Sequence, residues 1–168
     1  MAYLKRSDFI GNYRISANNI ELQKISEIII NAERTYLLRL FGIDIYNALL
    51  LTIDFGGQDP VPQEFVEVLN PISYIDSCGR LNYNDGLKSA LAKVIYYVIH
   101  TDQIVNNSSL GDRNNTSEVS NGVNSMKTLL LYNEGVRCLR VIQKYMLDNL
   151  DKYPNYEISS HFKYMSFI

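Results

Sequence analysis

The sequence predicts an all-α protein: a small bundle of about four to five helices, with a long polar loop before the last long helix and an extended C-terminal tail. Three observations predict this class. Apolar residues recur at steps of three and four over long stretches, glycine and proline separate those stretches, and 46% of the 168 residues are hydrophobic. That content is enough for one buried core. We expect a single helical domain over residues 1–154 and a tail over residues 155–168.

The first expected helix begins after Asn18 or Asn19, either of which can cap its first turn. Its apolar face consists of Leu22, Ile25, Ile29, Ala32, Tyr36 and Leu40. Gly42 follows this face, and a glycine in the left-handed conformation ends a helix at little steric cost. Asp44 can cap a second, shorter helix, so we predict a helical break at Gly42.

The middle of the chain alternates helix breakers with helical patterns. "DFGGQDPVP" (54–62) interrupts the chain, and Pro62 can open a short helix. Residues 70–86 are rich in turn formers, which predicts irregular structure with at most a short strand. Helical spacing returns over residues 85–105, the most apolar and therefore the central helix. It returns again over residues 124–153, where Gly135 marks a bend or a close helix crossing, and Pro154 ends this helix.

A polar stretch separates these last two helices. Residues 106–125 read "NNSSLGDRNNTSEVSNGVNS". Ordering this backbone costs on the order of 20–40 kcal/mol, whereas burying its few apolar side chains returns about 5–9 kcal/mol. We therefore predict a long interaction loop over residues 106–124 that either stays mobile or gains its contacts and hydrogen bonds from a partner. The candidate contact residues are Leu110, Arg113, Thr116, Val119 and Val123.

The C-terminal tail presents the opposite composition. It carries large apolar side chains at partly alternating positions, which indicates an extended segment. Such side chains are too apolar to remain in water, so we predict that the tail packs against a neighbouring molecule. The candidate partner-binding residues are Tyr156, Ile158, Phe162, Tyr164 and Phe167.

Charge and composition exclude several classes of protein. A formal net charge of −2 argues against a nucleic-acid binder that neutralises many phosphates. Arg137, Arg140 and Lys144 form either a basic stripe or an ordinary solvated helix face. No apolar run approaches the ~20 residues that span a bilayer, and the N-terminus lacks the pattern of a signal peptide. Cys78 and Cys138 are therefore expected to be free thiols in a reducing compartment.

Side chains typical of catalysis or ligand binding are scarce. His100 and His161 do not lie at metal-ligand spacing, and "FGGQD" lacks the lysine of a phosphate-binding loop. Cys138 borders the apolar face of the last helix, which predicts a packed thiol. Glu33 has the pattern of an ordinary surface charge. We predict no catalytic, cofactor-binding or metal-binding residue.

One stretch resembles a known family. "INAERTYLLRLFGIDIYNALL" (30–50) is similar to the first-helix signature of head–tail connector proteins (adaptor or head-completion proteins) of tailed bacteriophages, especially those of Bacteroidetes hosts. The resemblance covers residues 19–154 and is a pattern of small and apolar positions without a catalytic fingerprint. The matching residues are Ala32, Glu33, Tyr36, Leu37, Phe41, Gly42, Ile45, Tyr46, Leu49, Thr116, Ser120, Tyr132, Asn133, Tyr153 and Pro154.

The resemblance implies a structural virion protein that is made in the host bacterial cytoplasm. Its all-α core would assemble as a homo-oligomeric ring, commonly a dodecamer, beneath the portal at the head–tail interface. The ring would bind the portal protein and the next tail or connector protein, and DNA would pass through its channel as non-specific cargo. No enzyme activity, cofactor or membrane is implied. The residues alone leave a second possibility open, a small helical binding or regulatory module without catalysis.

Overall fold

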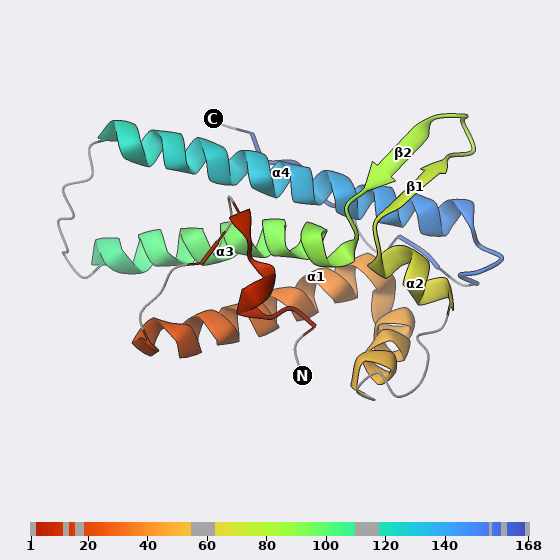
Figure 1. Cartoon of the computed structure of the whole chain (residues 1–168), viewed down its shortest axis with the longest axis horizontal. Coiled ribbons are helices and arrows are strands. Elements are labelled where there is room, and N and C mark those ends of the chain that lie inside the picture. Colours follow the sequence, from red (N-terminus) through yellow and green to blue (C-terminus); the bar gives the residue numbers. More distant parts are fainter. Residues whose placement is uncertain are drawn as a thin grey trace.

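The computed structural model describes residues 3–11, 14–15, 19–54, 63–109, 118–154, 156–158 and 161–166, with side chains except at 19–22, 51–54, 63–64, 103–109 and 118–125. Long helices form most of the molecule, and a small hairpin projects at one end (Figure 1). In chain order the elements are the 3-10 turn η1 (Arg6–Asp8), α1 (Asn19–Asp54), α2 (Gln63–Leu69), β1 (Ile72–Ile75), β2 (Leu81–Asn84), α3 (Leu87–Ser109) and α4 (Glu118–Asp148).

The centre of the fold is an antiparallel pair of helices, α3 and α4 (Figure 1). The helices approach closely at Gly135, where a Cβ atom would lie only 2.8 Å from the Ala90 carbonyl oxygen and 2.8 Å from Val94 Cγ1. The close crossing predicted at Gly135 is confirmed. Fully buried residues around it, such as Leu91 and Leu139, form the core, and α3 is central as expected.

Helix α1 runs along α3 and then turns away at Gly42 (Figure 1). Gly42 has φ 73° and ψ 175°, so it breaks the helical conformation inside α1. The predicted break is therefore confirmed, and the two helical segments on either side of it bury Leu37, Leu40 and Leu49 in the core.

The fold is predominantly helical but not all-α as predicted, because residues 72–84 form an antiparallel hairpin. Ile72 pairs with Asn84, and Ile75 pairs with Leu81. Gly86 then lets the chain enter α3, since its φ is 88° and a Cβ atom there would lie 2.9 Å from the Leu69 carbonyl oxygen. The two strands pair with each other, and β2 also packs against α4. These contacts stabilise strands in a stretch whose local sequence is rich in turn formers.

The N-terminal segment is held on α1 by Glu33. One carboxylate oxygen accepts the N–H of Tyr3 at 2.9 Å, and the other accepts the N–H of Leu4 at 2.6 Å. Glu33 is only 5% exposed, so its interpretation as a surface charge is wrong. Burial raises the pKa of Glu33, although the two N–H donors oppose that shift. Leu4 and Phe9 of this segment are buried in the core cluster, which makes the segment part of the core.

The polar stretch before the last helix is more helical than expected. Helix α3 continues to Ser109 and α4 already begins at Glu118, so the predicted limits of the loop, residues 106–124, are wrong. Extending a packed helix adds a hydrogen bond per residue without a new nucleation cost, which offsets part of the ordering cost.

In the part of the chain that the structure describes, no helix is long and apolar enough to cross a membrane.

Candidate functional site

The beginning and middle of the C-terminal tail pack on the chain's own core. Tyr156 is 3% exposed, and its hydroxyl donates to the Leu40 carbonyl oxygen at 2.9 Å, just before the break in α1. Phe162 is 1% exposed, and its ring stacks on Tyr36 with centroids 6.1 Å apart. The Arg39 guanidinium covers the same ring at 4.7 Å. The prediction that Tyr156 and Phe162 await a partner is wrong, because the α1 break leaves a carbonyl group and an apolar recess that these side chains fill.

The end of the described tail lies along α4. The Asn133 amide donates to the Met165 carbonyl oxygen at 2.8 Å and accepts the Met165 N–H at 2.8 Å, which fixes the backbone there. Ile158 is partly buried against the core. Tyr164, by contrast, is 50% exposed and stacks on the Arg140 guanidinium at 5.1 Å. Of the tail candidates that the structure describes, Tyr164 is the most exposed, and Ile158 is partly exposed.

The remaining sequence candidates cannot be compared with side-chain positions. Val119 and Val123 lie in the first turns of α4, but their side chains are not described. The other positions lie outside the described residues: Leu110, Arg113, Thr116 and Phe167. Their role in binding a partner stays a prediction.

The hairpin presents an apolar face that sequence reasoning missed. Its outward-facing side chains include Ile75, which is 70% exposed, and Leu81 directly opposite it, which is 76% exposed. Tyr83 extends this face and is 52% exposed. Monomeric proteins expose single apolar side chains routinely, but neighbouring ones on a rigid element are typical of interaction surfaces. We call Ile75, Leu81 and Tyr83 the hairpin face.

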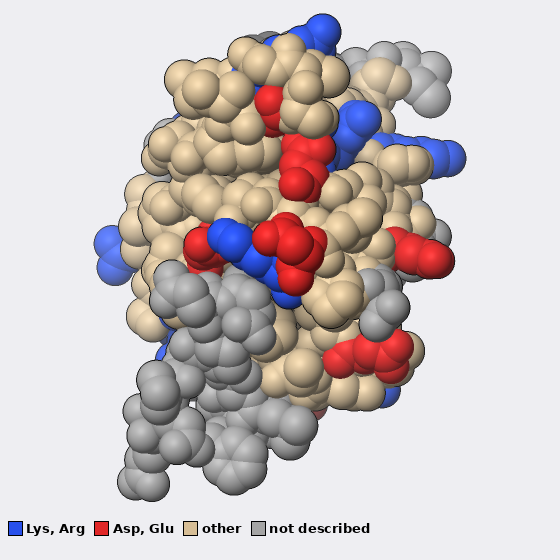
Figure 2. Space-filling view, turned by 90° about the vertical axis from the view of Figure 1, so that its right-hand side faces the viewer, with Lys and Arg blue, Asp and Glu red and all other residues tan. Residues whose placement is uncertain are grey.

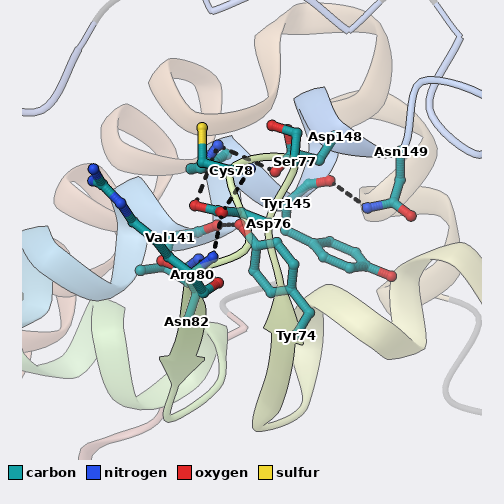
Figure 3. Close-up of polar contacts among 11 residues, drawn as sticks. Tyr74, Asp76, Ser77, Cys78, Arg80, Asn82, Val141, Tyr145, Asp148 and Asn149 are labelled. Atoms are coloured by element: carbon teal, nitrogen blue, oxygen red, sulfur yellow. Dashed lines mark hydrogen bonds and ion pairs between the residues drawn. The ribbon is translucent and has the colours of Figure 1, made fainter.

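The tip of the hairpin is fixed by Asp76 (Figure 3). Asp76 Oδ1 accepts the backbone N–H of Arg80 at 2.8 Å and that of Cys78 at 2.9 Å. The N–H of Arg80 in particular lowers the pKa of Asp76, because it stabilises the carboxylate. Lys144 Nζ lies 3.6 Å from this carboxylate, and Ser77 Oγ donates to Asp148 at 3.2 Å. These contacts tie the tip to α4.

The inner face of the hairpin is anchored by aromatic packing. Tyr74 meets Tyr145 of α4 edge-to-face, with centroids 5.0 Å apart, and its hydroxyl lies 3.5 Å from the Val141 carbonyl oxygen (Figure 3). Burial raises the pKa of Tyr74 well above its ordinary value. The hairpin is therefore held rigidly on one side, which keeps the hairpin face pointing outward.

The charge distribution near the hairpin is mixed. Figure 2 views the end of the molecule that carries the hairpin and α2. Acidic and basic side chains lie side by side near the centre of this view, and further side chains of both signs are scattered above them. One ion pair joins the Lys152 ammonium group to a Glu67 carboxylate oxygen at 2.8 Å. Charges of both signs interspersed on this face give no strong positive field for nucleic acid.

One buried cluster of titratable side chains within the described residues consists of ion pairs that link two helices. Lys93 lies between Asp85 and Glu134, at 2.7 Å from each, and is 6% exposed. Burial alone would lower the pKa of Lys93, but its hydrogen bonds to both carboxylates raise it. This triad links α3 to α4 beside the close crossing, so its role is to hold the helices together.

The described histidine and cysteine side chains form no cluster suited to metal binding. Across the described ranges, no group of three or more His, Cys, Asp or Glu side chains lies close enough to hold a metal ion. His100 is half-buried, and burial lowers its pKa. Cys138 is buried and Cys78 is exposed, and both are free thiols as expected. A groove of about 650 Å³ lies between the N-terminal segment, α2 and α3, where Lys88 and Asp8 pair at 3.4 Å.

Comparisons with known proteins add no relative. No family model, curated protein or solved structure matches this chain. The function must therefore be inferred from the residues, their geometry and the resemblance described above.

Proposed function

We propose that the protein is a structural subunit of the ring that connects the head of a tailed bacteriophage to its tail, and that it has no catalytic role. The hairpin face is the observation that carries the proposal. Ile75 and Leu81 are more than two-thirds exposed on a hairpin whose other side is anchored to α4. A rigid element with an uncovered apolar face is suited to pack against another subunit.

The positions that resemble the connector family support the proposal because they organise the ends of the chain. Glu33 holds the N-terminal segment, Gly42 breaks α1, and Asn133 holds the tail on α4. These residues have structural roles, as expected for a family without a catalytic fingerprint. Glu33 and Asn133 hold the two terminal segments on the helical body, and the hairpin face stays exposed beside them.

A second apolar surface offers a complement for the hairpin face. A groove of about 410 Å³ between α1 and α3 is lined by Ile28, Asn31, Ala32, Thr35, Tyr36, Arg39 and Val98. It involves none of the residues of the hairpin. Two different surfaces on one chain allow head-to-tail contacts, which close into a ring when the rotation between subunits permits.

Light scattering and negative-stain electron microscopy test this proposal. The purified full-length chain is examined alone and mixed with the portal protein encoded by the same phage genome. We expect rings, commonly dodecamers, or a stable complex with the portal. A chain that stays monomeric both alone and with the portal would overturn the proposal, and specific binding to a host protein instead would favour a regulatory module.

A further inference from the structure

A second groove lies between β2, α4 and the C-terminal tail, on residues that neither the hairpin face nor the α1–α3 groove uses. It has a volume of about 360 Å³. Its cationic side chains come from one face of α4, and the tail closes one side of it. The residues that line it are Asn82, Arg137, Arg140, Val141, Gln143, Lys144, Leu147, Ile158, His161 and Tyr164.

The two arginines of this groove retain free hydrogen-bonding capacity. Arg137 makes two long contacts, from Nη1 to the Tyr83 carbonyl oxygen at 3.4 Å and from Nη2 to Cys138 Sγ at 3.8 Å, and Arg140 lies over the Tyr164 ring. Among the residues that the structure describes, neither guanidinium has a carboxylate within 4.0 Å, and both residues are exposed. Each can therefore offer a planar pair of N–H donors to a carboxylate.

Lys144 differs from the arginines because it is already neutralised. Its ammonium group lies 3.2 Å from Asp148 and 3.6 Å from Asp76. The free positive charge of the groove is thus concentrated on Arg137 and Arg140, one helical turn apart. The sequence leaves two interpretations of Arg137, Arg140 and Lys144 open, a basic stripe or a solvated helix face, and the structure places all three in the lining of a groove.

We propose that this groove binds an acidic segment of a partner protein in an extended conformation. Charge complementarity favours carboxylates opposite Arg137 and Arg140, while the apolar atoms of Val141, Leu147 and Ile158 fit alternating apolar side chains. The groove extends along α4 from Arg137 to Leu147, roughly 15 Å of helix, which matches about four to five extended residues.

Nucleic acid is a poorer occupant of this groove. A strand of DNA is held by many phosphate contacts, whereas two unpaired arginines are available here and the chain carries a net charge of −2. The apolar part of the lining also has no counterpart in a phosphate backbone. The inference rests on this groove alone and holds whether or not the protein is a connector subunit.

Fluorescence anisotropy with a defined probe tests the proposal. The probe is a labelled hexapeptide of alternating glutamate and leucine, titrated with the full-length chain, and it is compared with a lysine–leucine hexapeptide, a single-stranded oligonucleotide of twelve nucleotides and inorganic phosphate as a competitor. We expect the acidic peptide to bind. Arg137→Gln and Arg140→Gln should each weaken it by about tenfold, since charge-assisted hydrogen bonds are lost.

Charge-matched variants provide the control. Arg34→Gln and Lys127→Gln, made singly, each remove one exposed positive charge elsewhere, as each test variant does, and should leave the affinity unchanged. Absence of peptide binding, equal weakening by the control variants, or arginine-dependent binding of the oligonucleotide or phosphate without the peptide would each overturn the inference. The oligomeric state of the arginine variants is measured in parallel, and we expect it to match the wild type, so failure here is distinct from failure of the ring proposal.

Discussion

The C-terminal tail and the β1–β2 hairpin both leave the helical body, yet they differ in what they bury. The tail has no helix or strand in its described residues, but Phe162 is 1% exposed and Tyr156 is 3% exposed. The hairpin has regular pairing and a fixed tip, but Leu81 is 76% exposed. Regular secondary structure is therefore a poor guide to which segment has completed its contacts. The irregular segment belongs to the core, and the regular one carries the uncovered apolar surface.

This contrast separates folding from assembly in the molecule. The tail fills a recess beside the break in α1 and contributes to the stability of the monomer. The hairpin face contributes little to that stability, because its side chains already lie in solvent. Changes in the tail should therefore alter unfolding, and changes in the hairpin face should alter association.

The largest effect is expected from a stop codon after Pro154. The truncated chain loses Tyr156 and Phe162 from the core, and losing a large buried aromatic side chain costs about 3–5 kcal/mol. Two such losses approach the whole stability of a typical domain, about 5–15 kcal/mol. We expect a largely unfolded or strongly destabilised chain by circular dichroism and thermal melting. A chain ending after Ser166 keeps both side chains and the Asn133–Met165 hydrogen bonds, so it should melt close to the wild type, and equal melting of all three chains would contradict the packed tail.

The next effect is expected from Phe162→Ala. The ring is buried between Tyr36 and Arg39, so its removal should lower the free energy of unfolding by about 3–5 kcal/mol. Tyr164→Ala is the matched control, since this exposed ring loses only its contact with Arg140, about 0.5–1 kcal/mol. Urea unfolding of the two variants measures the difference. Similar losses for both would show that the tail is held loosely along its whole length.

Much of this arrangement could be predicted from the sequence, and the exceptions have physical causes. Gly42 and Gly135 were predictable because helix periodicity locates them relative to an apolar face. Glu33 was wrongly predicted to lie on the surface. It lies four residues from both Ile29 and Leu37, which are buried, so its position in the helical period indicated a buried residue. A carboxylate in that position is stabilised by backbone donors about 30 residues away, which local patterns cannot show.

The hairpin and the grooves were harder to predict for a related reason. Each strand has four residues, which is too short for alternation to stand out from turn formers, and its pairing depends on contacts with α4. The tail was predictable as apolar, but not as self-packing. Its recess exists only after α1 breaks and the tail returns over residues more than a hundred positions earlier.

A moderate, pH-dependent effect is expected from Asp76→Asn at the hairpin tip. Hydrogen bonds, first that from the Arg80 N–H, hold the pKa of Asp76 below its ordinary value, so the folded state favours the carboxylate. This contribution is present above the unfolded pKa of about 4 and is lost as the pH falls through the lower folded pKa. The variant should therefore melt below the wild type at neutral pH, with the gap closing in acid. Asp151→Asn, an exposed change, is the control, and a gap independent of pH would contradict this role.

The smallest effect on stability is expected from replacing the hairpin face with Ile75→Thr and Leu81→Thr. Threonine is β-branched, which suits a strand, and both side chains are already mostly in solvent, so the free energy of unfolding should change by no more than about 0.5 kcal/mol. Association should nevertheless weaken strongly, because the proposed subunit contact loses its apolar surface. Ile10→Thr with Ile43→Thr removes two comparably exposed apolar side chains elsewhere and should preserve association. Urea unfolding and light scattering distinguish the outcomes. A hairpin variant that unfolds at a lower urea concentration than the wild type would show that the hairpin face stabilises the monomer. A hairpin variant that associates normally would show that the subunit contact lies elsewhere.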